Sequence, residues 1–504
     1  MMKENSNQNI REHKCISRFT YCAQKEFYEV IESFILPLCD TRGKLKLKDK
    51  PSKTNSLVSF DCDEDGKALL RFFPCISSKD YDAPFYLEIG TYSSKSIAKR
   101  MNAILREIVK VLEYNCYGGK IQKQRSYGKS NAKTPSYKSK TLQLAFELGM
   151  CSWIVPNKGA LVLHSILCRM EEWSAKTYEG KRVPFGFVID FNAKADDSSA
   201  SYLHFLDKNC SAVFTDGVFS GIRLDRDGKL LSFLTRNTPI LSAELVAGME
   251  AFVPHQFSDI AQHCFGNAIG VILQTNGEII LVKDRAICFA KRGGKWVSFE
   301  WDRVYTRLRP YFLADQNSNL KDKDIEERIK VIYKTLLDVS FSHIGGCLAI
   351  VLPNVNSTEI SKVIKDRFDL EVAGKLPEGV SKESKEKIKV LRYLLSDGNS
   401  RIHSFFEIDA PLRKEIMSLD GATVVSPDGL FYCAGSIVAV PGGSSGGGRT
   451  AAAKKLAQLG VGIKISEDGD IEAYGLSQIA QSNHSPVLVA PCTSGRIVPI
   501  FKLF

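Results

Sequence analysis

The chain has 504 residues of ordinary globular composition, 44% hydrophobic and 25% charged, which is more than one hydrophobic core usually holds. Lys and Arg outnumber Asp and Glu by 68 − 57 = 11, which favours anionic partners without choosing among them. No apolar run approaches the roughly 20 residues of a membrane-spanning helix, the N-terminus lacks a secretory apolar core, and the 14 cysteines form no C-x-x-C pair. We therefore expect a cytoplasmic protein without membrane contact or a cysteine-held metal.

Residues 1–145 mix helical apolar spacing with short strands, and we expect an α+β domain that ends in a basic loop. Its last stretch, Lys120 to Lys140, interleaves basic residues with Tyr127 and Tyr137 and contains no acid. A solvated loop is the simpler interpretation of this composition. Nucleic-acid contact is the alternative, and charge with aromatics alone supports it only weakly.

Residues 146–320 are interpreted as a sheet-rich domain that acts as a sensor. An apolar run predicts a buried strand at 185–190. Two hairpins follow, with turns at Asp227-Gly228 and Asn276-Gly277, which are residue pairs typical of tight turns between strands. A further strand is expected to end near Trp301. No nucleophile or metal constellation is visible in this part of the sequence.

Residues 321–504 show alternating helical and strand patterns. We expect a helix from about 325 to 337, strands at 347–352, 423–425 and 431–440, helices at 382–395 and 449–459, and two last strands on either side of Ser466–Gly469. The predicted fold class is α/β (α+β). A mixed central sheet flanked by helices forms the C-terminal part, and one or two α+β sensor-like domains precede it.

The strongest local signal is the run Pro441 to Thr450, which lies between an apolar strand and an alanine-rich helix. Its glycines allow the backbone to approach a ligand, the helix N-terminus offers unpaired N–H groups, and Arg449 adds a bidentate phosphate donor. The run therefore predicts an anion-binding loop. A glycine-rich linker is the alternative, and the adjoining strand and helix make it less favourable.

The same loop also fits a P-loop pattern, G-x-x-x-x-G-[KR]-[ST], from Gly443 to Thr450. Arginine then replaces the usual lysine, which acts as a compact point charge on the phosphates. Only 54 residues follow Thr450, which is short for a parallel sheet with a second acidic magnesium ligand. A P-loop-like nucleotide hydrolase is therefore one alternative.

A longer set of motifs resembles the diadenylate cyclase family. That family has a D-G-A motif, a G-T-R-H-R-A-A motif after a Gly/Ser loop, and an S-E-[ED] motif on the following strand. This chain has Asp420-Gly421-Ala422, then Gly447-Gly448-Arg449-Thr450-Ala451-Ala452, then Ser466-Glu467-Asp468. The order and spacing match, and the resemblance covers roughly residues 325–475.

The resemblance implies an enzyme that joins two ATP molecules into cyclic di-AMP and releases pyrophosphate. Asp420 would hold the ribose 3′-hydroxyl and a divalent metal, Mg²⁺ or Mn²⁺, and Glu467 would be a further metal ligand. Arg449 would act on the phosphates. The nucleotide-binding residues would be Gly421, Ala422, Gly446, Gly447, Gly448, Arg449, Thr450 and Ser466. Two ATP-loaded domains would face each other in a homo-oligomer, and the N-terminal region would sense an unidentified ligand or protein.

The chain departs from the family pattern at two positions. Thr450 stands in the place of histidine, and Ala451 stands in the place of the second arginine, which removes one charged phosphate contact. A catalytically weak or inactive nucleotide-binding sensor is therefore a second alternative.

Overall fold

The computed structural model describes four strands between residues 46 and 92, residues 102, 104 and 105, and then 137–155, 159–208, 215–240, 250–314, 321–364, 367, 382–396, 402–440, 447–477 and 496–503. The N-terminal strands form an antiparallel sheet in the order β1-β4-β3-β2. They are β1 (Lys46–Lys48), β2 (Val58–Cys62), β3 (Ala68–Phe72) and β4 (Tyr86–Tyr92). Most of the basic stretch, residues 120–136, lies outside the described residues.

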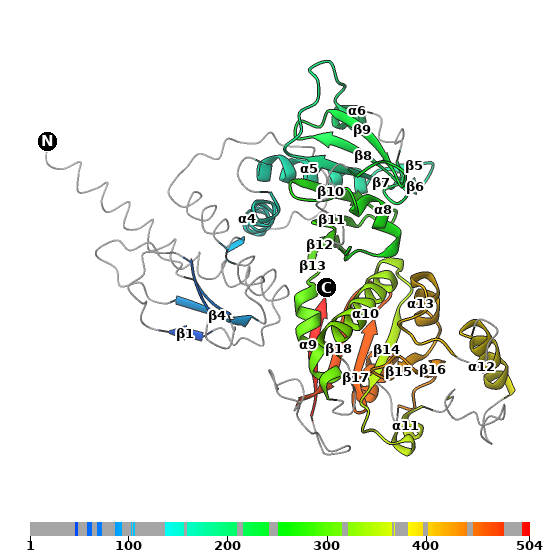
Figure 1. Ribbon diagram of the computed structural model, residues 1–504. Coiled ribbons are helices and arrows are strands. Elements are labelled where there is room, and N and C mark those ends of the chain that lie inside the picture. The colour runs from blue at the N-terminus through cyan, green and yellow to red at the C-terminus, as the bar shows by residue number, and fades with distance from the viewer. Residues whose placement is uncertain are drawn as a thin grey trace.

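The middle region is built on a seven-stranded sheet in the order β13-β12-β11-β10-β7-β8-β9, shown in the upper part of Figure 1. Only β7 and β8 pair in parallel. The strands are β7 (Phe185–Asp190), β8 (Ser220–Asp225), β9 (Leu230–Thr235), β10 (Ala268–Leu273), β11 (Ile279–Lys283), β12 (Ala286–Arg292) and β13 (Lys295–Ser298). A separate two-stranded sheet is formed by β5 (Thr177–Tyr178) and β6 (Lys181–Arg182). The helices are α4 (Tyr137–Ile154), α5 (Gly159–Ser174), α6 (Tyr202–Lys208), η2 (His255–Phe257) and α8 (Ser258–Ala261).

The C-terminal region is built on a six-stranded mixed sheet in the order β16-β15-β14-β17-β18-β19, in the lower part of Figure 1. Its strands are β14 (Gly346–Val351), β15 (Ala422–Val425), β16 (Phe431–Ser436), β17 (Gly460–Ile465), β18 (Ile471–Leu476) and β19 (Ile497–Leu503). Its helices are α9 (Trp301–Leu313), α10 (Asp322–Ser342), α11 (Ser357–Val363), α12 (Lys382–Leu394), α13 (Ala410–Met417) and α14 (Gly448–Leu456). Helices with mixed and antiparallel sheets make this an α+β fold.

Both faces of the six-stranded sheet are buried, because β14 contributes alternate side chains to two hydrophobic clusters. Leu348 and Ile350 join the cluster that contains α10. Cys347, Ala349 and Val351 join the cluster that contains α11 and α14. The central strand is therefore covered by α10 on one side and by α14 on the other.

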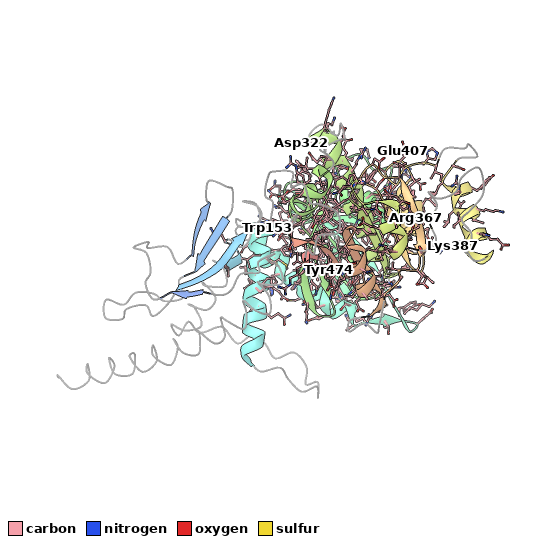
Figure 2. All side chains as sticks on the ribbon, turned by 90° about the horizontal axis from the view of Figure 1, so that it is seen from below. Trp153, Asp322, Arg367, Lys387, Glu407 and Tyr474 are labelled. Carbon is pink, nitrogen blue, oxygen red and sulfur yellow. The ribbon has the colours of Figure 1, made fainter. Side chains whose placement is uncertain are left out.

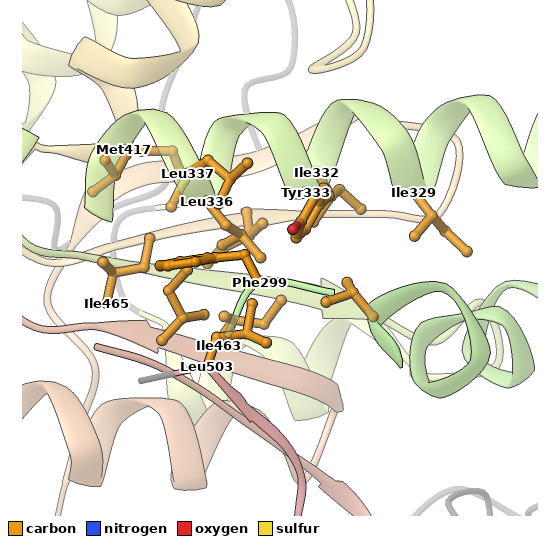
Figure 3. Close-up of a cluster of buried hydrophobic side chains, with 14 of the residues drawn as sticks. Phe299, Ile329, Ile332, Tyr333, Leu336, Leu337, Met417, Ile463, Ile465 and Leu503 are labelled. Carbon is orange, nitrogen blue, oxygen red and sulfur yellow. The ribbon is translucent and has the colours of Figure 1, made fainter. Parts of the chain in front are cut away.

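The first of these clusters also joins the middle region to the C-terminal region. Phe299, which follows β13, packs against Phe341 of α10 with ring centres 5.3 Å apart, and it belongs to the same cluster as Ile463 of β17 (Figure 3). Helix α9 packs against α10 and β19, and the Tyr311 hydroxyl lies 3.5 Å from the Leu476 carbonyl oxygen. One continuous apolar core therefore runs from the seven-stranded sheet into the six-stranded sheet.

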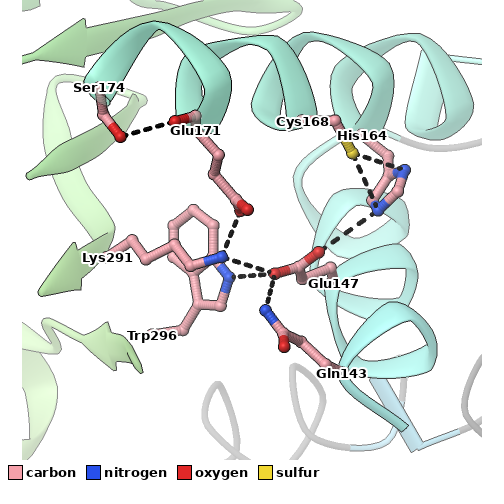
Figure 4. A network of polar contacts seen from close by, with 8 residues as sticks. All are labelled: Gln143, Glu147, His164, Cys168, Glu171, Ser174, Lys291 and Trp296. Carbon is pink, nitrogen blue, oxygen red and sulfur yellow. Dashed lines mark hydrogen bonds and ion pairs between the residues drawn. The ribbon is translucent and has the colours of Figure 1, made fainter. Parts of the chain in front are cut away.

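A buried polar network fastens α4 and α5 to the seven-stranded sheet (Figure 4). Glu147 of α4 accepts hydrogen bonds from Lys291 Nζ and Trp296 Nε1, each at 3.0 Å, and pairs with His164 of α5 at 3.4 Å. Burial alone would raise the pKa of Glu147, but hydrogen bonds from His164, Trp296 and Lys291 lower it to about 2. These contacts give His164 a structural task.

Several expected elements need correction. The strand expected near Trp301 ends at Ser298, and Trp301 instead begins α9, in which Pro310 lies inside the helix. The last residues of the expected basic loop, from Tyr137, form the start of α4, so the expected boundary at 145/146 falls within that helix. The strand β19 was not expected. Among the described helices, none has the length and apolar character needed to cross a membrane.

Buried Asp338 on α10 should make the stability of this core depend on pH. Its carboxylate accepts the His255 backbone N–H at 2.6 Å, and burial raises its pKa from 3.8 to about 6. Because the folded-state pKa is raised, the destabilisation grows as the pH rises from about 4 to 6 and is complete above 6. Asp338→Asn keeps an acceptor without the charge, so above pH 6 it should stabilise the protein by about 2 to 3 kcal/mol.

Urea denaturation at pH 4 and pH 7.5 checks this expectation. The variant and the natural protein should unfold at similar urea concentrations at pH 4 and at different ones at pH 7.5. Asp197→Asn is the control, because the Asp197 side chain is 92% exposed. Equal midpoints at pH 7.5 would show that the buried carboxylate carries no penalty.

Candidate functional site

The sheet order brings the predicted motifs to the edge of the C-terminal sheet at which β14 and β15 begin and β17 ends. On one side of β14 lies β15, in parallel, with Leu348 opposite Thr423; on the other lies β17, antiparallel, with Gly346 opposite Ile465. The residues that precede β15 and those that follow β17 therefore lie at the same edge, about 10 Å or two strand spacings apart. This places the Asp420 and Glu467 segments on either side of the start of β14.

The third motif reaches this edge through α14, which covers the face of β14 and β17. Arg449, in the first turn of α14, pairs through Nη1 with Glu467 Oε1 at 2.8 Å. The same Nη1 lies 2.6 Å from the position of an ideal Cβ on Gly345, so the guanidinium rests on the backbone just before β14. A cation and a helix N-terminus are thus combined at the sheet edge, which is a favourable place for an anion.

The Asp420-Gly421 segment has a clear structural basis. Gly421 has a φ of 108°, and an ideal Cβ on it would lie 2.6 Å from the Ser436 carbonyl oxygen. Glycine is required there because β15 and β16 approach each other closely. Asp420 itself is exposed, and its side chain has no hydrogen-bond or ion-pair partner among the described residues. Its carboxylate is therefore available to a ligand.

The other predicted site residues divide into accessible and buried groups. Gly447 and Gly448 have open space beside them. Ala422 is only 1% exposed and Thr450 only 9%, so neither is available at the surface. Ser466 accepts the Asp470 backbone N–H at 3.0 Å and shapes the turn after β17. Gly446 lies outside the described residues, as does the rest of 441–446.

The two carboxylates are oxygen donors of the kind that a divalent cation prefers. Mg²⁺ is commonly bound by one or two carboxylates together with substrate phosphates. Asp420 is unpaired among the described residues, and Glu467 is engaged only by a partly exposed arginine. Within the described ranges, no cluster of three or more His, Cys, Asp or Glu side chains could hold a metal ion.

Two residues at this edge were missed by sequence reasoning. Lys387 of α12, at the periphery of Figure 2, donates to the Gly435 carbonyl oxygen, beside the Asp420 backbone. Ser436 is 1% exposed, and its hydroxyl has no partner among the described residues. The only sequence signal for Lys387 was a charged helix, and nothing in that pattern links it to Asp420.

The middle region contains a cavity of about 720 Å³ near the end of β7. Its polar lining includes the ion pair of Asp190 with Arg223 and the hydrogen bond from Asn267 Nδ2 to Asn192 Oδ1 at 3.0 Å. Burial and the nearby Arg223 lower the pKa of His263, so this ring is neutral at pH 7. The volume lies within the range of small-molecule binding sites.

Comparison of the chain with protein-family models, with curated proteins and with solved structures finds no match. The function is therefore inferred from the residues gathered at the edge of the C-terminal sheet.

Proposed function

We propose that the protein is a diadenylate cyclase that condenses two ATP molecules into cyclic di-AMP in a homo-oligomer. One observation carries the proposal: the Asp420 segment, the first turn of α14 and the Glu467 turn all lie where β14 and β15 begin and β17 ends. In the reaction each 3′-oxygen bonds to the α-phosphorus of the opposite ATP, and each α–β phosphoanhydride bond breaks with loss of pyrophosphate.

The residues divide this work by charge. Arg449 and the N-terminus of α14 bind the phosphates, and Asp420 orients the ribose 3′-hydroxyl of the ATP in its own chain. A divalent cation bound by Asp420, Glu467 and the phosphates would supply the positive charge that neutralises the leaving group. Lys387, near the Asp420 backbone, offers a further cation close to the proposed site of the ribose.

The pair between Arg449 and Glu467 must open when the nucleotide binds. The two side chains are 41% and 68% exposed, and an exposed pair of this kind contributes only about 0 to 1 kcal/mol. A triphosphate can therefore replace Glu467 on Arg449 at little cost, and the released carboxylate then becomes available to the cation. In this proposal, the Arg449–Glu467 ion pair belongs to the protein without bound nucleotide.

The P-loop alternative has less support from the topology. The strand before the glycine loop, β16, is the outermost strand of the sheet and is antiparallel to β15. A P-loop strand instead belongs to a parallel sheet. Thr450, which would face the metal in a P-loop, is 9% exposed. The inactive nucleotide sensor remains the second candidate, favoured by the absent arginine at Ala451.

The proposed regulation rests on the middle region. Its cavity combines the charged pair of Asp190 and Arg223 with two asparagine side chains, so it suits a small polar ligand with both donors and acceptors. Contact with an unidentified protein is the other form that this regulation would take. Cytoplasmic location follows from the nature of the proposed substrate and is part of the same proposal.

Incubation of the purified protein with ATP and Mn²⁺ should yield cyclic di-AMP and pyrophosphate. Because each reaction needs ATP from two chains, the rate per chain should rise with protein concentration until the oligomer saturates. Chromatography of the products over a range of protein concentrations checks both points. ADP and phosphate would favour the hydrolase, and ATP binding without any product would favour the nucleotide sensor.

A further inference from the structure

The turn between β17 and β18, which carries Glu467, is held at two backbone carbonyls. Arg292 of β12 donates through Nη1 to the Gly469 carbonyl oxygen at 2.7 Å. His343, at the end of α10, lies with Nδ1 3.0 Å from the Glu467 carbonyl oxygen. Arg292 belongs to the seven-stranded sheet, so the middle region directly contacts the turn that bears a candidate metal ligand.

Glu278, the residue before β11, contacts both Arg292 and His343. Its Oε1 lies 3.0 Å from Arg292 Nε and 3.3 Å from His343 Nε2. The Glu278 side chain is only 7% exposed, and its Oε2 has no partner among the described residues. Asn276, in the β10–β11 turn, lies beside the same imidazole, with its side-chain amide 2.7 Å from His343 Nε2. Glu278 thus connects a cationic side chain of the seven-stranded sheet with a side chain at the end of α10.

The arginine in this arrangement has little freedom to move. Its guanidinium lies over the Phe341 ring, 4.2 Å from the ring centre, and donates to Ser340 Oγ at 2.9 Å. Ser340 Oγ in turn donates to the Gly469 carbonyl oxygen at 2.5 Å. The Arg292 and Ser340 contacts with Gly469 are buried, so the seven-stranded sheet and the Glu467 turn are joined by direct hydrogen bonds.

We propose that Glu278, Arg292 and His343 are positioning residues that set the place of Glu467 relative to Arg449, and that the middle region regulates the nucleotide site through them. This inference rests on the proposed function. It also joins the two sites, because β10 begins at Ala268, which lines the cavity, and leads into the hairpin that carries Asn276.

His343→Asn is the most specific test. His343 has a φ of 54°, which asparagine also adopts readily, and the shorter side chain cannot reach the Glu467 carbonyl. We expect the Mn²⁺ concentration needed for half-maximal activity to rise about tenfold, with a melting temperature within about 2 °C of the natural protein. Glu179→Asn is the matched control, because Glu179 has a φ of 50° in the exposed β5–β6 turn.

A double-variant cycle shows whether the effect passes through Glu467. The readout is the dissociation constant of Mn²⁺-ATP by calorimetry, which needs no turnover. In the natural background His343→Asn should weaken binding about tenfold. In the Glu467→Gln background the same change should alter binding by less than about twofold. Equal effects in both backgrounds would overturn the positioning role.

Hydrogen exchange separates this inference from the proposed function. In both His343→Asn and Arg292→Lys, amides in residues 460–476 should exchange faster than in the natural protein, whether or not any cyclic product forms. If the natural protein makes no cyclic product, the proposed function is wrong. Hydrogen exchange in the two variants would still test whether Arg292 and His343 hold the Glu467 turn in place. Unchanged hydrogen exchange in both variants would show that Arg292 and His343 do not hold the Glu467 turn in place.

Discussion

Replacing Asp420 by asparagine should lower the rate of cyclic di-AMP formation at least about a thousandfold while leaving the fold intact. The carboxylate is exposed and unpaired among the described residues, so its charge contributes no interaction that holds the chain together. In the proposed reaction the same charge acts on the 3′-hydroxyl and on a cation. ATP affinity, measured in the absence of a divalent metal, should change little, because Arg449 and α14 provide the phosphate contacts.

Asp428→Asn is the matched control for this variant. Asp428 also precedes a glycine, and its carboxylate accepts a hydrogen bond from Ser426 Oγ in the β15–β16 turn. Asparagine followed by glycine suits the same kind of turn. The rate should therefore remain within about threefold of the natural value. Near-normal turnover in Asp420→Asn would remove Asp420 from the site and leave Glu467 as the only acidic metal ligand in the proposal.

Gly462→Val should disrupt both stability and nucleotide binding. An ideal Cβ on Gly462 of β17 would lie 1.9 Å from the Ala453 carbonyl oxygen, so any side chain there must push α14 away from the sheet. The clashing atom belongs to the helix backbone, so the clash cannot be relieved by a change of side-chain rotamer. We expect a loss of about 3 kcal/mol or more, together with weaker ATP binding, because Arg449 lies on the same helix.

Thermal unfolding and calorimetric ATP titration test this pair of effects. If Gly462→Val fails to fold, Gly462→Ala provides a smaller displacement of the same helix. Gly448→Ala is the control for stability, since an ideal Cβ on Gly448 meets nothing within 4 Å and alanine favours the helix. An unchanged melting temperature in Gly462→Ala would show that α14 moves freely over β17.

Some strands were predictable because their boundaries are local. Strand β14 begins and ends within one residue of the expected range, since an apolar run there is bounded by glycine on one side and proline on the other. The strand β7 matches its expected range of 185–190 for a similar reason. Hairpins at Asp227-Gly228 and Asn276-Gly277 follow from turn chemistry that four residues specify.

Elements whose signals are weak or non-local were missed. Helix α9 contains Pro310, which ordinarily argues against a helix interior. The approach of Lys387 to Gly435 joins residues 48 positions apart, and that of Arg292 to Gly469 joins residues 177 apart. No periodicity encodes such contacts. The pairing of Arg449 with Glu467 was also absent from the prediction, because the motif resemblance gave each residue a separate task.

The apolar core that α9 shares with the six-stranded sheet bears on how such a protein diversifies. The residues that would carry the chemistry all follow residue 419, yet the sheet beneath them is covered in part by α9 and by Phe299, which precede residue 314. A recombination event at the polar stretch near residue 320 would separate the six-stranded sheet from α9 and Phe299, which pack on it. The smallest transplantable module is therefore longer than the motif-bearing segment, and it brings the contacts of Arg292 and Glu278 with it.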